Sequence, residues 1–433
     1  MNTSFFRDLL DQIVERGRSL TSFSLGNTDH GGTIETLSKG LLSGRGESTG
    51  VAVAQHILSI FDLLDEDEKR AYFNFLAKAF TPDEDKVHKA ARAYVAAPSP
   101  KNLRALSKSV ESPRQEFFRR LNLAPGGTAA MVHMREDLLR FLKDNEDLKP
   151  VDQDLSHLFG SWFNRGFLVM QHIEWQTPAN ILEKIIEYEA VHEIQGWEDL
   201  KSRLDPANRR CYGFFHPSLI DEPLIFVEVA LTRDMPASIH DLLEPAEDGG
   251  DDAGESTAVF YSISNCQKGL QGISFGNFLI KQVVSDLSRE MPSLKTFVTL
   301  SPAPGFINWL EKNASDVGFD MALLEDADWV NDAEKAAALE PQLTSLAAHY
   351  FLNAKSKSGK PIDPVARFHL GNGARLQRIN WMADLSGRGV SQSSGIMVNY
   401  LYDLRHIERN HEAFAEQGII AASSSVKRLA GGG

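Results

Sequence analysis

The sequence has few cysteines and lacks any long apolar run. The 433 residues include only two cysteines, Cys211 and Cys266. Two cysteines are too few for a disulfide framework, and their spacing is not that of metal ligands, so a reducing compartment is the simplest expectation. No uninterrupted apolar stretch reaches the roughly 18 residues that a transmembrane helix needs. The segment MNTSFFRDLLDQIVERGRSL has apolar residues at helical spacing with acidic residues among them, unlike a signal peptide or an acid-poor transit peptide. We therefore expect a cytoplasmic protein that does not bind membranes.

Positive charge is also in short supply. The chain has 45 Lys and Arg against 59 Asp and Glu, which gives a formal net charge of −14. Nucleic-acid binding depends on the neutralisation of phosphates, so this balance disfavours a nucleic-acid partner. A small polyanion needs only a local group of donors and is not excluded. The length of 433 residues exceeds the usual size of one hydrophobic core, so we expect two domains.

The patterns along the chain predict two different architectures. Up to about residue 160, apolar residues recur at helical spacing, and proline-containing breaks separate successive helices. Runs of β-branched and aromatic residues follow at 211–216 and 224–231 and predict a hairpin-like pair of strands. We expect an α+β protein, with an all-α helical domain at residues 1–160 and an α/β domain with a mixed central sheet at residues 161–433.

The segment Phe260–Leu310 has the pattern of a βαβ unit. A strand at 259–263 precedes a turn with three glycines, an amphipathic helix at 276–290 and a second strand at 297–300. Glycine lets the backbone approach a ligand closely, and the first N–H groups of a helix lack intrahelical partners, so such a turn can hold a pyrophosphate. An ordinary strand-to-helix turn fits the spacing equally well. The turn is neither a Walker loop nor a GxGxxG fingerprint.

Two polar side chains are candidates for chemistry. Ser301 directly follows the second strand of this unit, where open α/β sheets place their active sites, although a capping or turn role is also common there. His369 is expected in a strand before a tight turn at 371–373. A buried, hydrogen-bonded histidine is the ordinary role there, and a proton donor is the alternative. Residues 391–402 suggest a further glycine-led helix start.

Three blocks of the sequence resemble the malonyl-CoA decarboxylase family. They are YSISNCQKGLQGISFGNFLIK, TLSPAPGFINWL and PVARFHLGNGARLQRINWMAD. The stretch QGISFG is also similar to the pyrophosphate loop of the GNAT acyltransferase superfamily, with Ser274 where that superfamily prefers glycine. The resemblance implies a GNAT-like catalytic domain that converts malonyl-CoA to acetyl-CoA and CO2. It also implies a helical domain through which the chain forms a homo-oligomer, either a dimer or a tetramer.

The family motifs imply site residues by position. The catalytic pair is Ser301, as hydrogen-bonding partner and proton acceptor, and His369, as proton donor. Tyr402 matches an assisting tyrosine, although a core aromatic fits this position equally well. Some members of the family carry a glutamate at the position of Ser274. Whether this chain needs the role of that glutamate is therefore left open. The malonyl-CoA loop corresponds to Gln271, Gly272, Ile273, Ser274, Phe275, Gly276 and Asn277.

The chemistry of this reaction needs no metal and no organic cofactor. The thioester carbonyl itself accepts the electrons that CO2 leaves behind, so the protein supplies donors for the enolate oxygen and a proton for the α-carbon. Two other functions remain open from the sequence. One is a CoA-dependent acyltransferase, and the other is a non-catalytic acyl-CoA-binding sensor. Release of CO2 from malonyl-CoA without an acyl acceptor would distinguish a decarboxylase from both the acyltransferase and the sensor.

Overall fold

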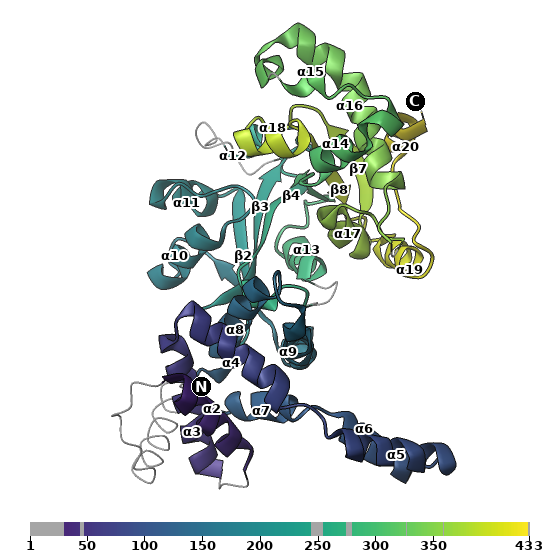
Figure 1. Ribbon diagram of the computed structural model, residues 1–433. Coiled ribbons are helices and arrows are strands. Elements are labelled where there is room, and N and C mark those ends of the chain that lie inside the picture. Colours follow the sequence, from purple (N-terminus) through teal and green to yellow (C-terminus); the bar gives the residue numbers. More distant parts are fainter. Residues whose placement is uncertain are drawn as a thin grey trace. The chain divides into compact units, whose positions relative to one another are not determined.

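The computed structural model describes residues 30–43, 47–243, 254–273, 279–325, 327–357 and 359–431 (Figure 1). The chain forms two compact units. Unit 1 comprises Met1–Val169, His216–Glu222 and Gln267–Phe275, and unit 2 comprises Met170–Phe215, Pro223–Cys266 and Gly276–Gly433. Within the described ranges, none of the helices combines the length and apolar character that crossing a bilayer requires.

Unit 1 is built from helices, as the apolar periodicity predicts. Asp65 caps α4 in a capping box with Glu68, and a proline stands in the first turn of α6, α7 and α9, where the missing N–H is not needed. Fully buried phenylalanines, among them Phe73, Phe117 and Phe159, form the core. The helices are α2 (His30–Leu42), α3 (Glu47–Leu63), α4 (Glu66–Ala79), α5 (Glu84–Ala96), α6 (Pro100–Val110), α7 (Pro113–Leu121), α8 (Gly127–Phe141) and α9 (Lys149–Trp162).

Unit 2 contains most of an eight-stranded mixed sheet. The order is β1-β2-β3-β4-β5-β8-β6, and β7 pairs with β8. β2–β3, β3–β4, β5–β8, β6–β8 and β7–β8 are antiparallel, whereas β4–β5 is parallel. The expected α+β class with a mixed sheet is therefore confirmed. The strands are β1 (Val169–Ile173), β2 (Arg209–Phe215), β3 (Pro223–Thr232), β4 (Thr257–Asn265), β5 (Thr296–Thr299), β6 (Ser301–Pro302), β7 (Arg375–Asn380) and β8 (Met397–Leu401).

Helices cover both faces of this sheet. The apolar sides of α10 and α11 pack against Cys211 and Phe226, and α13 lies on the other side of the sheet (Figure 1). The predicted hairpin-like pair is β2–β3, and the predicted βαβ unit is β4–α13–β5, so both predictions are confirmed. The helices are α10 (Ala179–Tyr188), α11 (Trp197–Leu204), α12 (His240–Leu243), α13 (Leu279–Glu290), α14 (Phe306–Val317), α15 (Ala322–Glu325), α16 (Ala333–Asn353), α17 (Pro364–Gly371), α18 (Gly387–Ser393), α19 (Ile407–Gln417) and α20 (Ser424–Gly431).

The parallel strands β4 and β5 stay paired over only part of their length. Their register covers residues 257–260 and 296–299. On the other side of β4 the register with β3 shifts at Tyr261, because Glu228 pairs with Ser262 while Val229 pairs with Phe260. Such a bulge bends and twists a strand locally. Beyond it, β4 continues with β3 alone, and the chain after β5 pairs with β8 instead.

Two local predictions are wrong. His369 does not lie in a strand but in α17, which begins after Asp363 with Pro364 in its first turn. The Asp363 carboxylate accepts a hydrogen bond from the N–H of Ala366, and this cap together with the proline favours a helix over the apolar alternation. The helix start expected within 391–402 is instead strand β8. The tight turn before β7 is present, with Gly373 at φ +85°.

Candidate functional site

A pocket of about 280 Å³ lies at the place in unit 2 where β4 and β5 separate. Most of its wall is apolar and comes from the sheet, α13 and α17, and Ser301 and His369 add polar atoms. Lysine and arginine are missing from the described side chains that line it. A carboxylate in this pocket would therefore lie in a poorly solvating environment without an ion-pair partner. Apolar lining residues include Ile225, Val227, Phe260, Ile263, Leu279 and Phe368.

The structure brings Ser301, His369 and Tyr402 together. His369 Nε2 lies 3.1 Å from Ser301 Oγ, and His369 Nδ1 lies 2.8 Å from the Tyr402 hydroxyl. All three side chains are buried. They come from three elements, because Ser301 begins β6, His369 stands near the end of α17, and Tyr402 directly follows β8. The Tyr400 ring stacks on the imidazole at a centroid distance of 4.7 Å and fixes its plane.

Thr299 sets the direction of the hydrogen bonds in this group. The Ser301 hydroxyl donates to Thr299 Oγ1 at 2.9 Å, and the backbone N–H of Tyr400 donates to the same atom at 3.2 Å. Because the Ser301 hydrogen points to Thr299, Ser301 Oγ accepts from His369 Nε2–H. Nδ1 is then the acceptor nitrogen and receives the Tyr402 hydroxyl hydrogen. The result is a continuous line of neutral hydrogen bonds from Tyr402 to Thr299.

Burial keeps this line uncharged. It lowers the pKa of His369 from 6.5 to about 3, so the imidazole is neutral near pH 7. Burial also raises the pKa of Tyr402 well above its ordinary value, so the phenol stays protonated. A neutral imidazole and a hydroxyl that face an apolar pocket can donate hydrogen bonds to an oxygen that gains negative charge.

The expected binding loop is described only in part. Ser274, Phe275, Gly276 and Asn277 lie outside the described residues. The other members, Gln271–Ile273, belong to unit 1 and follow the short 3₁₀ helix η3 (Lys268–Leu270). Gly272 has φ +80°, a left-handed conformation that side chains other than glycine adopt at a cost.

Arg135 of α8 holds the start of this turn within unit 1. Its guanidinium donates to the carbonyl oxygen of Gly269 at 2.6 Å and to that of Gln271 at 3.0 Å. The turn approaches α8 so closely that a Cβ atom on Gly269 would lie 1.8 Å from the Val132 carbonyl oxygen. The first glycine is therefore explained by packing against α8. Sequence reasoning missed Arg135, because a single arginine in a helix carries no signal of its distant partner.

Thr299 and Tyr400 were also missed by sequence reasoning. Thr299 is fully buried, and its hydroxyl contacts Ser301 two residues later. A signal was present, because residues two apart in an extended strand point to the same side. Tyr400 carries no comparable signal, since its ring meets His369 only through the tertiary fold.

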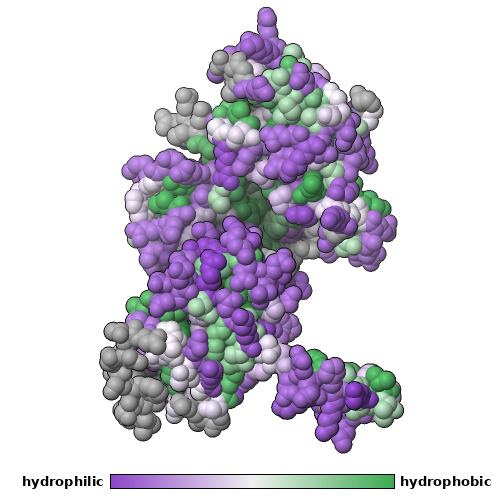
Figure 2. Space-filling model, viewed as in Figure 1, coloured by the Kyte–Doolittle hydropathy of each residue, from purple (hydrophilic) through white to green (hydrophobic). Residues whose placement is uncertain are grey.

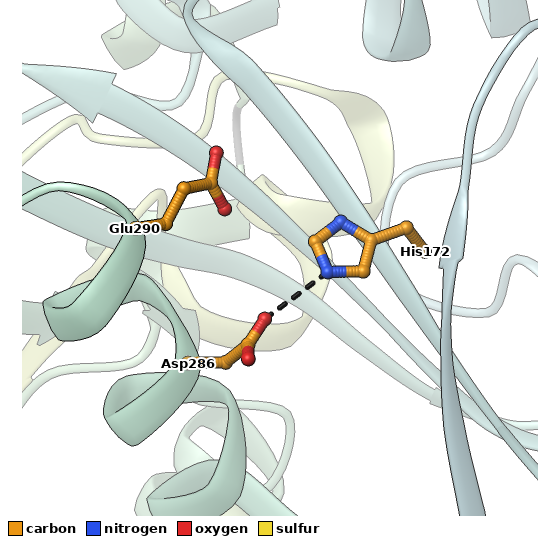
Figure 3. A group of neighbouring side chains, drawn as sticks. All are labelled: His172, Asp286 and Glu290. Atoms are coloured by element: carbon orange, nitrogen blue, oxygen red, sulfur yellow. Dashed lines mark hydrogen bonds and ion pairs between the residues drawn. The ribbon is translucent and has the colours of Figure 1, made fainter.

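One cluster among the described residues has the side chains and the spacing to hold a metal ion. His172, Asp286 and Glu290 each offer one ligand atom, and these atoms lie within 4.8 Å of one another (Figure 3). None of the three lines the pocket that contains Ser301 and His369. The cluster is therefore separate from the candidate active site.

Comparison with known proteins gives a consistent family match. A model of the malonyl-CoA decarboxylase C-terminal domain matches residues 166–432, and a model of the N-terminal domain matches residues 80–163. The mitochondrial malonyl-CoA decarboxylase of Anser anser anser is 38% identical over 349 residues, which are 73% of this chain and 69% of that protein.

Two solved structures are similar over nearly the whole chain. The crystal structure of malonyl-CoA decarboxylase from Rhodopseudomonas palustris shares 53% sequence identity with a TM-score of 0.88, and it covers 92% of this chain and 99% of its own. The enzyme from Agrobacterium vitis shares 52% identity with a TM-score of 0.87 and the same coverage.

Proposed function

The chain belongs to the malonyl-CoA decarboxylase family, and on this premise we propose that it converts malonyl-CoA to acetyl-CoA and CO2 with Ser301, His369 and Tyr402 as its catalytic residues. One observation supports this site most strongly. Ser301 and His369 are hydrogen-bonded in the wall of an apolar pocket that has no cationic side chain among its described lining residues.

The pocket favours loss of the carboxylate. An anionic carboxylate that enters an apolar site without a cation loses solvation, whereas the charge is dispersed over the thioester as CO2 leaves. The bond between the α-carbon and the carboxylate carbon breaks, and its electron pair moves to the thioester carbonyl to form an enolate. The Ser301 hydroxyl and the His369 Nε2–H stabilise the enolate oxygen when they turn to it from the acceptors that they have in the substrate-free site, Thr299 Oγ1 and Ser301 Oγ.

A proton then has to reach the α-carbon. We assign the His369 imidazole as its donor, because a thioester enolate is a strong base and the Nε2 hydrogen points toward the Ser301 side of the pocket. When this proton leaves, the ring becomes an imidazolate anion, which the Tyr402 hydroxyl stabilises by donating a hydrogen bond to Nδ1, and a proton from solvent water then restores the neutral ring. Since the thioester accepts the electrons, we propose that neither a metal nor an organic cofactor takes part.

We propose that Gln271, Gly272, Ile273, Ser274, Phe275, Gly276 and Asn277 bind the CoA part of the substrate. Two observations in the described part of this loop support the proposal. Gly272 has the left-handed backbone that a tight anion-binding turn needs, and Arg135 engages two carbonyl groups of the turn. The guanidinium of Arg135 offsets the negative partial charge of these two carbonyl oxygens, which would otherwise repel an anionic ligand.

Two substitutions test the catalytic assignment. We expect Ser301→Ala and His369→Ala each to lower kcat by roughly 10²-fold or more, as the loss of one donor to an oxyanion does. Binding of CoA, measured by calorimetry, should be retained. Ser288→Ala and His349→Ala, which remove the same side chains elsewhere in unit 2, should leave kcat unchanged. Unchanged CO2 release in both site variants would reject the assignment.

The same assay separates the other functions. CO2 release from malonyl-CoA by chelator-treated protein without an acyl acceptor would exclude both a transferase and a binding-only sensor. Transfer of an acyl group that depends on an added acceptor would favour the acyltransferase instead. Comparison with methylmalonyl-CoA and free malonate would define the substrate range.

We also propose that residues 1–160 assemble the chain into a homo-oligomer, a dimer or a tetramer, and that residues 161–433 are catalytic. Helices α5 and α6 support this role. They lie side by side, and none of the described residues 81–111 is buried (Figure 1). Val95, Leu103 and Val110 are 79%, 51% and 50% exposed, and Figure 2 shows apolar atoms at the surface of this hairpin. Two such short helices need a covering partner for stability, and a second copy supplies matching apolar residues.

We propose a cytoplasmic location for the chain. Cys211 and Cys266, the two cysteines of the sequence, are buried thiols that are not joined in a disulfide, and a reducing compartment maintains thiols in this form. Burial raises the pKa of the Cys211 thiol well above its ordinary value, which keeps it protonated and unreactive. Fractionation of cells that express the full chain tests the location.

A further inference from the structure

His172, Asp286 and Glu290 form a group at the surface of unit 2 that the decarboxylation does not use. His172 lies on β1, while Asp286 and Glu290 stand one helical turn apart on α13 and project toward the imidazole ring (Figure 3). His172 Nε2 lies 3.1 Å from Asp286 Oδ2. His172 and Glu290 also line an open pocket of about 430 Å³, so an ion can reach them from solvent.

Each carboxylate has one oxygen held by an arginine. Arg210 donates from Nε at 3.0 Å and from Nη2 at 2.9 Å, both to Glu290 Oε1. Arg289 donates to Asp286 Oδ1, and the other oxygen of Asp286 faces His172. In metal sites, hydrogen bonds to the non-ligating oxygen orient the carboxylate and leave its second oxygen for the metal. Asp286 Oδ2 and Glu290 Oε2 are the oxygens left in this way.

Tyr212 adds a second, independent observation. Its side chain has no exposed surface, and its hydroxyl has no hydrogen-bond partner among the described residues. The phenol ring packs against the His172 ring at a centroid distance of 4.6 Å. A buried hydroxyl without a partner is costly, and a ligand in the cluster would provide one.

We propose that His172, Asp286 and Glu290 bind one divalent first-row transition-metal ion, with the Tyr212 hydroxyl as hydrogen-bond partner of a metal-bound water. One imidazole with two carboxylates suits Zn²⁺, Co²⁺ or Mn²⁺ better than Mg²⁺ or Ca²⁺, which prefer oxygen ligands alone. Bonds of roughly 2.0–2.2 Å to a tetrahedral ion place ligand atoms about 3.3–3.6 Å apart. The His172–Asp286 distance of 3.1 Å is close to this separation, and the exposed side chain of Glu290, whose ligand atom lies within 4.8 Å of the other two, can rotate toward them.

The role of this ion is structural. It links β1, at the end of the sheet order, to α13, whose first residues Leu279 and Ile280 line the substrate pocket. A ligand that binds only the folded state stabilises it in proportion to its occupancy. Zinc should therefore raise the unfolding temperature without being required for CO2 release, and the inference stands independently of the proposed catalytic residues.

Metal binding to the full chain tests this inference. The chelator-stripped protein is dialysed against Zn²⁺ and, separately, Co²⁺ and Mg²⁺, and bound metal is measured per chain. We expect one Zn²⁺ or Co²⁺ per chain, little Mg²⁺, and affinity at least tenfold weaker in His172→Gln and in Asp286→Asn. His157→Gln, at an exposed histidine of α9, is the matched control and should bind like the parent chain. No zinc uptake by the parent chain, or equal uptake by the two site variants, would overturn the proposal.

Discussion

Ser301 Oγ and His369 Nε2 lie 3.1 Å apart, although the two residues are 68 positions apart in the chain. The contact depends on two local features of the sequence. Strand β5 ends at Thr299, and Ser301 begins β6, which pairs with β8. The helix that carries His369 begins after its cap Asp363, with Pro364 in the first turn. The pair is therefore positioned by a strand end and by a helix cap, which are both short-range effects.

The Thr299 hydroxyl should affect the rate of decarboxylation, because it orients the hydrogen bonds of Ser301 and His369. Thr299→Val keeps the shape of the side chain but removes the acceptor for the Ser301 hydrogen, so Ser301 and the imidazole lose their fixed donor directions. We expect kcat to fall about tenfold, the effect of roughly one hydrogen bond, with KM nearly unchanged. Thr299→Ser restores the acceptor and should restore kcat. Steady-state kinetics of CO2 release checks both, and equal rates for the valine and threonine forms would contradict the assigned direction.

Tyr402→Phe should affect turnover more than binding. The variant removes the hydroxyl that donates to His369 Nδ1 at 2.8 Å and leaves that nitrogen without a partner in a buried site. We expect kcat to fall by about tenfold or more, because the imidazolate form of His369 is no longer stabilised by this hydrogen bond. Tyr188→Phe, at a partly buried tyrosine outside the pocket lining, is the control. A fall in affinity for CoA with unchanged kcat would assign Tyr402 to binding instead.

Much of this arrangement was predictable where the pattern is local. The βαβ unit β4–α13–β5 and the β2–β3 pair follow from apolar periodicity and turn residues, and both are present. The position of His369 was misread because alternating apolar residues fit either element until the cap at Asp363 is considered. Ser301 and His369 were candidates from their positions in the sequence, but their pairing and the role of Tyr402 came from the family motifs, since the contact of these residues depends on tertiary packing. The contact of Arg135 with the Gly269 carbonyl has no local signal at all.

Gly269→Ala should weaken the packing of the binding turn on α8. The added Cβ would come within 1.8 Å of the Val132 carbonyl oxygen, a backbone atom that cannot move aside easily. We expect a loss of about 1–3 kcal/mol in the free energy of unfolding, as for other overpacked sites. Gly160→Ala is the matched control, because a Cβ at this helical position of α9 meets nothing within 4 Å. Urea unfolding should show that control to be neutral or slightly stabilised.

Leu103→Glu on α6 should disrupt assembly and leave the fold intact. The side chain is 51% exposed in the single chain, so a charge there is tolerated until a second copy covers it. Light scattering should then show a smaller species than for the parent chain. Lys101→Glu, an exposed charge change on the same helix, serves for comparison. An unchanged mass for Leu103→Glu would place the subunit interface elsewhere.

Glu228→Gln should change how stability depends on pH. Burial and the nearby Glu189 carboxylate raise the pKa of Glu228 from 4.5 to about 8, despite the opposing effect of Arg203. Between these two values the folded state holds a proton that the unfolded chain releases, so the stability that Glu228 contributes is present below about pH 4.5 and is lost as pH rises toward 8. Glutamine does not titrate, and its amide oxygen still accepts a bond from Arg203.

The free energy of unfolding of Glu228→Gln should therefore rise relative to that of the parent chain between pH 5 and 8, by up to about 1.4 kcal/mol per pH unit. Urea titrations at several pH values measure this difference, with the exposed Glu187→Gln as control. If the free energy of unfolding changed with pH in the same way for Glu228→Gln and for the parent chain, Glu228 would be ionised throughout this range. In that case the Arg203 guanidinium, which also binds Asp199, must compensate for the burial of Glu228.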